Sequence, residues 1–277
     1  MNENFYNQIK ANANKNFAIS EGDYQKDGIY YCGKCHEPKQ TKQENPFTNN
    51  IDTIYVACGC VKKLEDEQKQ IEKKEHIKKA KKECFTGKRA FEQTFENDDL
   101  TNKTASEVLK KNYIANFDTY KNDGTGLLFY GGTGTGKTFL ARAVLHSLIE
   151  QGKKAKEISI IKAYNHVCAN GEAKENFIEE LTHKDIILID DLGAEKTNEA
   201  ITEFVFNLVN TLYENKIPVV YTTNLSLDHF VNADLNTSTG RIYSRVYGVS
   251  IPIEINKVNK RIESLKNICR TWKQNNA

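Results

Sequence analysis

The sequence predicts an α/β fold in which a parallel sheet is flanked by helices, preceded by a small cysteine-bearing domain and a charged helix. Three observations lead to this prediction. Short apolar runs, each typical of a buried strand, alternate with segments of helical spacing between residues 104 and 273. A glycine-rich loop separates the first of these runs from the helix that follows it, and four cysteines in two close pairs lie near the beginning of the chain.

The bulk composition sets limits on the class of protein. A chain of 277 residues with 39% hydrophobic content can form at least one core and allows two domains. Residues 1–10 lack the apolar stretch of a signal peptide, and no run approaches the roughly 20 apolar residues of a membrane span. We therefore expect a soluble, cytoplasmic protein without a membrane partner. Because 39 Lys+Arg face 37 Asp+Glu, binding to nucleic acid has to depend on local patches.

The two cysteine pairs are Cys32-Gly33-Lys34-Cys35 and Cys58-Gly59-Cys60. Two thiolates separated by two residues form a tight knuckle on one side of a tetrahedral Zn²⁺, and the second pair closes the coordination sphere. Gly33 eases the first turn, and Gly59 allows the shorter second spacing because glycine takes strained dihedrals. The β-prone residues before each pair predict a small domain built on a hairpin.

We therefore predict one structural zinc ion bound by Cys32, Cys35, Cys58 and Cys60. An odd total of seven cysteines in a chain without a signal peptide argues against a disulfide framework. A redox dithiol is the alternative. His36 adjoins a ligand and is expected to be a bystander. The isolated Cys84, Cys168 and Cys269 are expected to be small core residues.

Residues 61–85 contain neither proline nor glycine and predict a helix with a thin apolar stripe at Leu64, Ile71, Ile77 and Ala80. Eleven basic residues face six acidic ones over residues 61–90. A surface for DNA or an acidic partner is one interpretation. A solvated connecting helix with Glu–Lys pairs is favoured, because both signs alternate along it. Residues 1–28 are compatible with a short helix or with a loosely ordered arm.

The glycine-rich loop fits the phosphate-binding pattern and lies between the apolar run 127–130 and the helical spacing of residues 139–145. Its glycines let successive N–H groups point at the phosphates of ATP, and the helix N-terminus adds a favourable dipole. Lys137 is predicted to reach the β and γ phosphates, and Thr138 to bind Mg²⁺. The predicted ATP-binding residues are Gly131, Gly132, Thr133, Gly134, Thr135, Gly136, Lys137 and Thr138.

Two acids follow the apolar run 186–189, which predicts a buried parallel strand. The carboxyl ends of such strands are where parallel sheets bind ligands. Asp190 is predicted to hold Mg²⁺ through its waters, and Asp191 to orient or deprotonate the water that attacks the γ-phosphate. Further strands are predicted at residues 155–161, 218–223 and 251–255, and further helices at 104–120, 196–215 and 258–273.

Two more features follow the acids. Asn224 ends a predicted strand, where its amide is placed to position the attacking water, although a lone Asn at a strand end is equally often a turn residue. Arg241 and Arg245 are four residues apart, on one face of a short predicted helix. Arginine neutralises phosphate with two parallel hydrogen bonds, and in an oligomer one of the two can reach a neighbour's nucleotide. Surface salt bridges are the ordinary alternative.

The series GGTGTGKT, IILIDDLG, YTTN and GRIYSRV resembles the AAA+ ATPase domain of bacterial and phage replicative-helicase loaders of the DnaC and DnaI type, from Phe91 to the C-terminus. The resemblance implies that Asp190 handles metal, Asp191 is the catalytic acid, Asn224 is the sensor and Arg245 is a finger acting on a neighbouring subunit. The cysteine-bearing beginning is similar to zinc-containing loaders of Gram-positive bacteria and their phages, whose amino-terminal domain grips the helicase.

The sequence departs from this family in two ways. The usual lid with a second sensor arginine is not evident, which leaves Arg261 as a weak candidate. The second acid is Asp191 rather than the longer Glu common in AAA+ proteins, which suits slow hydrolysis.

We therefore expect a zinc-binding, helicase-interacting domain over residues 1–85 and an AAA+ ATPase over residues 86–277. The expected function is ATP-dependent loading of a hexameric replicative helicase on single-stranded DNA, with self-assembly in the ATP state.

A transposition-helper ATPase of the IstB type shares the same motifs and is the strongest alternative. A zinc-scaffolded interaction protein with structural ATP is another. A DnaA-like initiator is disfavoured because fewer than 30 residues follow Gly248. A small-molecule kinase is the least favoured class, because the segments YTTN and GRIYSRV would have no role in such an enzyme.

Overall fold

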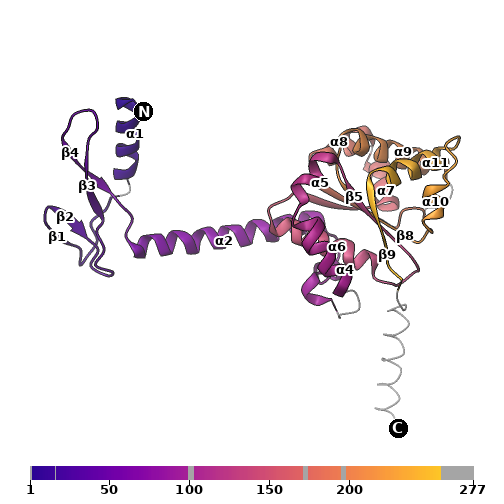
Figure 1. The fold of residues 1–277 in the computed structure, drawn as a ribbon, viewed down its shortest axis with the longest axis horizontal. Coiled ribbons are helices and arrows are strands. Elements are labelled where there is room, and N and C mark those ends of the chain that lie inside the picture. Colours follow the sequence, from indigo (N-terminus) through magenta and orange to yellow (C-terminus); the bar gives the residue numbers. More distant parts are fainter. Residues whose placement is uncertain (1, 16, 99–102, 171–173, 195–197, 257–277) are drawn as a thin grey trace, which may run out of the picture. The chain divides into compact units, whose positions relative to one another are not determined.

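The computed structural model describes residues 2–15, 17–98, 103–170, 174–194 and 198–256. The chain divides into two compact units, Met1–His76 and Ile77–Ala277 (Figure 1). The helix predicted over residues 258–273, together with Arg261 and Cys269, lies outside the described residues. Within the described ranges, no helix combines the length and the apolar character that crossing a membrane requires.

The first unit begins with a helix, α1 (Glu3–Asn14), capped by the side chain of Asn2, which accepts a hydrogen bond from the Phe5 amide at 2.9 Å. Of the two alternatives for this segment, the helix is therefore the one observed. Two antiparallel hairpins follow, β1 (Tyr24–Lys26) with β2 (Ile29–Tyr31), and β3 (Gln40–Glu44) with β4 (Ile51–Tyr55). The predicted hairpin-based domain thus contains two hairpins.

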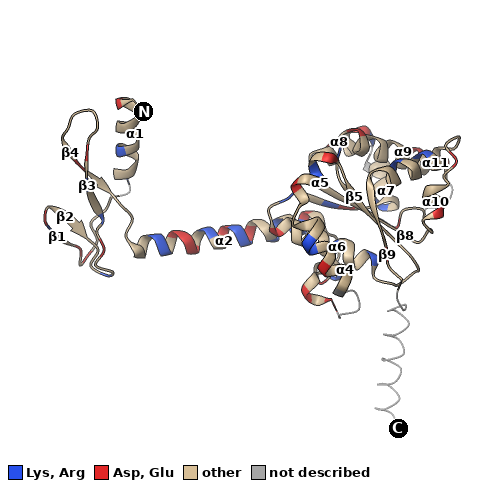
Figure 2. Cartoon of the chain, in the orientation of Figure 1, with Lys and Arg blue, Asp and Glu red and all other residues tan. Residues whose placement is uncertain are grey.

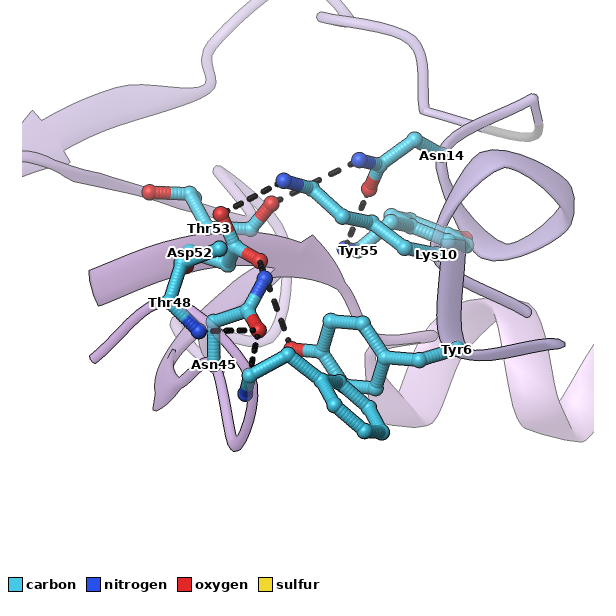
Figure 3. A network of polar contacts seen from close by, with 9 residues as sticks. Tyr6, Lys10, Asn14, Asn45, Thr48, Asp52, Thr53 and Tyr55 are labelled. Atoms are coloured by element: carbon cyan, nitrogen blue, oxygen red, sulfur yellow. Dashed lines mark hydrogen bonds and ion pairs between the residues drawn. The ribbon is translucent and has the colours of Figure 1, made fainter. Parts of the chain in front are cut away.

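Polar contacts hold α1 on the second hairpin (Figure 3). The Lys10 ammonium lies 2.5 Å from Oδ1 of Asp52, the Tyr6 hydroxyl donates to Oδ2 of Asp52 at 3.3 Å, and Asn14 accepts from the Tyr55 amide at 2.8 Å. Among the described residues of this unit, the buried apolar side chains are only Tyr6, Cys32 and Cys58. The first unit therefore has almost no hydrophobic core of its own.

The predicted charged helix is α2 (Gly59–Cys84), and charges of both signs alternate along it (Figure 2). Leu64 and Ile71 are exposed, whereas Ile77 and Ala80 pack against the core of the second unit. The apolar stripe therefore serves packing only at its C-terminal end. Both observations agree with the connecting-helix interpretation.

The second unit is built on a sheet of five parallel strands in the order β6-β7-β8-β5-β9. This confirms the predicted α/β class. Leu127 and Phe129 face one core cluster and Leu128 the other, so both faces of the sheet are covered. The strands are β5 (Gly126–Tyr130), β6 (Ala155–Ser159), β7 (Ile186–Asp190), β8 (Val219–Thr223) and β9 (Ser250–Glu254).

Helices cover both faces of this sheet (Figure 1). On one face lie α6 (Lys137–Glu150) and α5 (Phe117–Asp123). The other face is covered by α7 (Ile160–Asn170), α8 (Lys174–Thr182), α9 (Glu199–Glu214) and α11 (Ser238–Gly248). The shorter elements are α3 (Lys88–Phe91), a 3₁₀ turn (Phe95–Asn97), α4 (Lys103–Val108) and α10 (Asp228–Val231).

The helix predicted over residues 104–120 is interrupted. After α4, a π-helical turn spans Leu109–Ile114, and α5 begins at Phe117. The Asn116 side chain donates to the carbonyl of Asn112 at 2.8 Å, which replaces a regular helical contact at the break. Tyr113, Ile114 and Phe117 are all buried, so the wider turn brings these three apolar side chains to the core.

The isolated cysteines differ from one another. Cys84 is 1% exposed, as expected for a core residue. Cys168 on α7 is exposed, so the prediction that it fills the core is wrong. Its helix packs with the neighbouring Ala163 and Ile160 facing inward, which leaves position 168 on the solvent side.

Candidate functional site

The predicted phosphate-binding loop lies between β5 and α6, at the carboxyl edge of the sheet. Gly131, Gly134 and Gly136 have φ angles of 135°, 79° and 105°, which side chains other than hydrogen rarely permit. A Cβ atom on Gly131 would lie 2.6 Å from the carbonyl oxygen of Ile255. The curled loop therefore depends on these glycines, as its sequence pattern predicts.

The loop lysine is directed inward. Lys137 is 6% exposed, and its Nζ donates to the carbonyls of Gly131 at 2.9 Å and Gly132 at 2.6 Å. It also donates to Oδ1 of Asn224 at 2.8 Å. Asn224 therefore lies beside the loop lysine, at the end of β8, and forms part of the same site.

The two acids meet the loop from the adjacent strand. Thr138 donates to Oδ1 of Asp190 at 2.9 Å, so a hydroxyl and a carboxylate oxygen converge, the hard ligands that Mg²⁺ prefers. The hydroxyl of Thr222 donates to the same Asp190 oxygen at 2.6 Å and accepts from the Asp191 amide at 2.9 Å. Asp191 takes a φ of 57°, which turns the chain immediately after β7.

Thr222 is a site residue that sequence reasoning missed. It is fully buried in β8, and it joins this strand to Asp190 at the end of β7 and to Asp191 immediately after it. The sequence does contain a signal for Thr222. It lies two residues before Asn224, and alternate residues of a strand point to the same face.

The loop, the acids and Asn224 line one pocket of about 490 Å³, a size typical of small-molecule sites. Sequence reasoning did not assign five of its lining residues, Arg89, Gln93, Asn97, Phe139 and Arg142. The Arg142 guanidinium donates hydrogen bonds to Glu157 of β6 and to Gln93. These contacts hold the Gln93 side chain at the pocket wall. Only the tertiary fold reveals this wall, because its residues form no local pattern. The donors and the glycine loop together fit ATP with Mg²⁺.

The two arginines of α11 do not line this pocket within the described residues. Their guanidinium carbons lie 5.6 Å (Arg241) and 5.0 Å (Arg245) from the ring centroid of Phe206. They share a helix face, as their spacing predicts.

The four predicted metal ligands form a cluster. The sulfur atoms of Cys32, Cys35, Cys58 and Cys60 all lie within 4.8 Å of one another. A tetrahedral zinc site with Zn–S bonds of about 2.3 Å places its sulfurs roughly 3.8 Å apart, so a small contraction fits the ion. His36 is not in the cluster that the described residues form. The cluster is compatible with the predicted zinc site.

The thiols of the cluster influence one another. Backbone amides of Glu37 and Cys60 lower the pKa of Cys35 to about 6. A hydrogen bond with Cys35 raises the pKa of Cys60 to about 11. Cys60 thus keeps its proton because Cys35 ionises more easily. A bound dication would stabilise the thiolate form of both residues, so that both could ionise together.

Contacts around each pair explain the two glycines. A Cβ atom on Gly33 would lie 2.1 Å from the carbonyl oxygen of Gly22. Gly59 lies at the start of α2 without a positive φ, so the prediction that it takes strained dihedrals is wrong. Its amide donates to Oε2 of Glu37 at 2.6 Å, and a Cβ atom there would meet the same carboxylate at 3.0 Å. Close approach, rather than dihedral freedom, accounts for Gly59.

These features define an α/β ATP-binding unit of the AAA+ class. A family model described as "IstB-like ATP binding protein" matches residues 61–247, and the chain belongs to this family. The match covers α2 and most of the second unit, and it leaves the four clustered cysteines outside.

Curated relatives include proteins of DNA replication. The chain is 28% identical over 253 residues to the "Chromosomal replication initiator protein DnaA" of Borreliella afzelii, covering 82% of this chain and 46% of the relative. It is 22% identical over 227 residues to the "Replicative helicase loader DnaI" of Bacillus subtilis, covering 76% of this chain and 70% of the relative. The chain thus spans about half the length of the initiator relative.

Two solved structures share the fold. A DnaC helicase loader superimposes with a TM-score of 0.52 at 23% identity, covering 61% of this chain and all of that chain. A DnaI structure superimposes with a TM-score of 0.51 at 18% identity, covering 64% of this chain and 94% of that chain. Both superpositions show that the chain shares the fold of these two proteins.

Proposed function

We propose that this protein is an ATP-dependent loader that helps to place a hexameric replicative helicase on single-stranded DNA. One observation carries the ATPase part of the proposal. Lys137, Thr138, Asp190 and Asn224 are joined by direct hydrogen bonds at the carboxyl edge of the sheet. Such an edge, with a glycine loop and a helix N-terminus, binds a nucleoside triphosphate.

Within this site each residue has a role. Residues Gly131 to Thr138 hold the phosphates, and Thr138 and Asp190 hold Mg²⁺, which neutralises the charge that develops in hydrolysis. Asp191 orients and deprotonates the attacking water, and Asn224 positions it beside Lys137. Arg245 stabilises the γ-phosphate of a neighbouring subunit, so turnover requires assembly. Arg261 has no role in this proposal.

The beginning of the chain supplies the specificity for the helicase. Residues 1–85 contain the cysteine cluster and α2, whereas the ATP-binding residues all follow residue 88. A zinc-stabilised unit offers a rigid surface without phosphate chemistry. The alignment with a loader over 76% of this chain supports the assignment. The matched family is described as IstB-like, so the alternative that the test has to separate is a transposition-helper ATPase of the IstB type.

Co-elution of the full chain with a hexameric replicative helicase tests the proposal. We expect the wild-type chain to co-elute without nucleotide, because the binding surface carries no phosphate chemistry. The Cys58→Ser/Cys60→Ser chain is expected to lose co-elution and to keep its affinity for a fluorescent ATP analogue. Cys168→Ser is the matched control, since Cys168 is exposed and outside the cluster. Capture of a transposase with no capture of the helicase would replace the loader by the transposition helper.

A further inference from the structure

Two arginines of α11 lie on one aromatic ring of α9. The guanidinium carbons of Arg241 and Arg245 lie 5.6 and 5.0 Å from the centroid of Phe206, within the range of a cation–π contact. Helices α9 and α11 pack side by side (Figure 1). Ile242 and Val246 of α11 are buried in the shared core, so the adjacent row that carries both arginines lies along the edge of this contact.

A ring holds a guanidinium differently from a carboxylate. A carboxylate neutralises the charge and accepts the N–H groups, whereas an aromatic face attracts the charge and leaves the N–H donors to other partners. Among the described residues, neither Arg241 nor Arg245 forms an ion pair with an acid or donates a side-chain hydrogen bond. Phe206 therefore orders both cations and preserves their capacity to bind an anion.

The start of α11 fixes this row in place. The hydroxyl of Thr237 accepts a hydrogen bond from the Gly240 amide at 2.9 Å and caps the helix. A Cβ atom on Gly240 would lie 1.9 Å from the carbonyl oxygen of Asp234, so the preceding loop packs closely on the helix. Two like charges over one ring repel each other, and an anion bound between them removes that repulsion.

We propose that Phe206 is a positioning residue for Arg245, and that Arg241 and Arg245 together bind the triphosphate held by a second copy of this chain. The inference rests on the proposed function, which assigns Arg245 to a neighbour's nucleotide. It adds a second cation to that contact and a ring that holds both. Because Phe206 reduces the number of conformations of two long side chains, less entropy is lost when they reach the phosphates.

Steady-state ATP turnover of the full chain on single-stranded DNA tests the role of Phe206. Phe206→Leu keeps an apolar side chain and removes the ring, and we expect it to lower kcat roughly fivefold to thirtyfold, the effect of losing a cation–π contact. KM and the affinity for a fluorescent ATP analogue stay within about twofold, because the chain's own pocket is untouched. Phe206→Tyr restores kcat. Phe177→Leu is the matched control, because Phe177 is a partly buried phenylalanine of the same cluster and none of the described arginines lies on its ring.

A second comparison separates positioning from general packing. In a chain that already carries Arg241→Ala and Arg245→Ala, Phe206→Leu is expected to have no further effect on kcat. The inference is overturned if Phe206→Leu alone leaves kcat unchanged. It is also overturned if Phe206→Leu lowers kcat by the same factor in the Arg241→Ala/Arg245→Ala chain as in the wild-type chain.

Failure of the proposed function gives a different result. Full turnover by Arg245→Ala chains refutes the contact between subunits itself. If Arg245→Ala chains lose turnover and mixing them with Asp191→Asn chains restores part of it, that contact stands, since some junctions then pair an intact acid with an intact arginine. An unaffected Phe206→Leu chain beside that result refutes only the role of Phe206.

Discussion

Replacing Lys137 by alanine is expected to lower the affinity for ATP by roughly 100- to 1000-fold. A charge-assisted hydrogen bond contributes about 1.5–3 kcal/mol, and this ammonium is placed to reach two phosphates. Its surroundings support the role, since Lys137 is almost fully buried and its present acceptors are loop carbonyls and Asn224, which the phosphates can replace or join. Titration of a fluorescent ATP analogue measures the loss.

Asp191→Asn provides the contrast, because it keeps the shape of the side chain and removes its basicity. We expect affinity for the analogue within about threefold of wild type, and a loss of turnover of roughly 100-fold or more, the usual contribution of a general base. A phosphate-release assay beside the titration separates binding from chemistry. Equal loss of binding in both variants would contradict the roles assigned to Lys137 and Asp191.

The second large effect is expected in the first unit. The Cys58→Ser/Cys60→Ser chain should lose its zinc, from about one ion per chain to none, and the fold of the first unit with it. This unit buries only Tyr6, Cys32 and Cys58 as apolar side chains among its described residues. A unit with so small a core needs another source of stability, and structural zinc contributes on the order of 10 kcal/mol in comparable small domains.

Elemental analysis and limited proteolysis measure these changes. Cleavage within residues 1–76 is expected to accelerate in the double variant, while the second unit stays resistant and keeps its affinity for ATP. The Cys168→Ser chain should retain both the metal and the resistance. A native protein that is folded and free of zinc would contradict the prediction.

The strands of the second unit were predictable in their order along the chain, because each apolar run has the length of a strand. β5, β7 and β8 are fully or almost fully buried, and their sequences show it. The interruption at Asn116 was not predictable, because Tyr113, Ile114 and Phe117 also fit a regular helix. The two helices α7 and α8 were missed, since they carry no motif to mark them.

The candidate site was predictable where its chemistry follows a local pattern. The loop, the two acids and Asn224 each stand at the end of a recognisable strand, and parallel strands bring such ends together. Arg89, Gln93 and Arg142 were missed because they meet only through tertiary packing. Phe206 was not singled out within the predicted helix, and nothing in its spacing indicates that two arginines lie on its ring.

Helicase loading on a closed circle of single-stranded DNA tests the central claim most directly. A circle has no end to thread through a preformed ring, so a hexamer can be trapped on it only after the ring opens. We predict that this protein with ATP greatly increases the amount of helicase retained on the circle, and that Lys137→Ala and Cys58→Ser/Cys60→Ser chains do not. Retention that is the same with and without this protein would contradict the account.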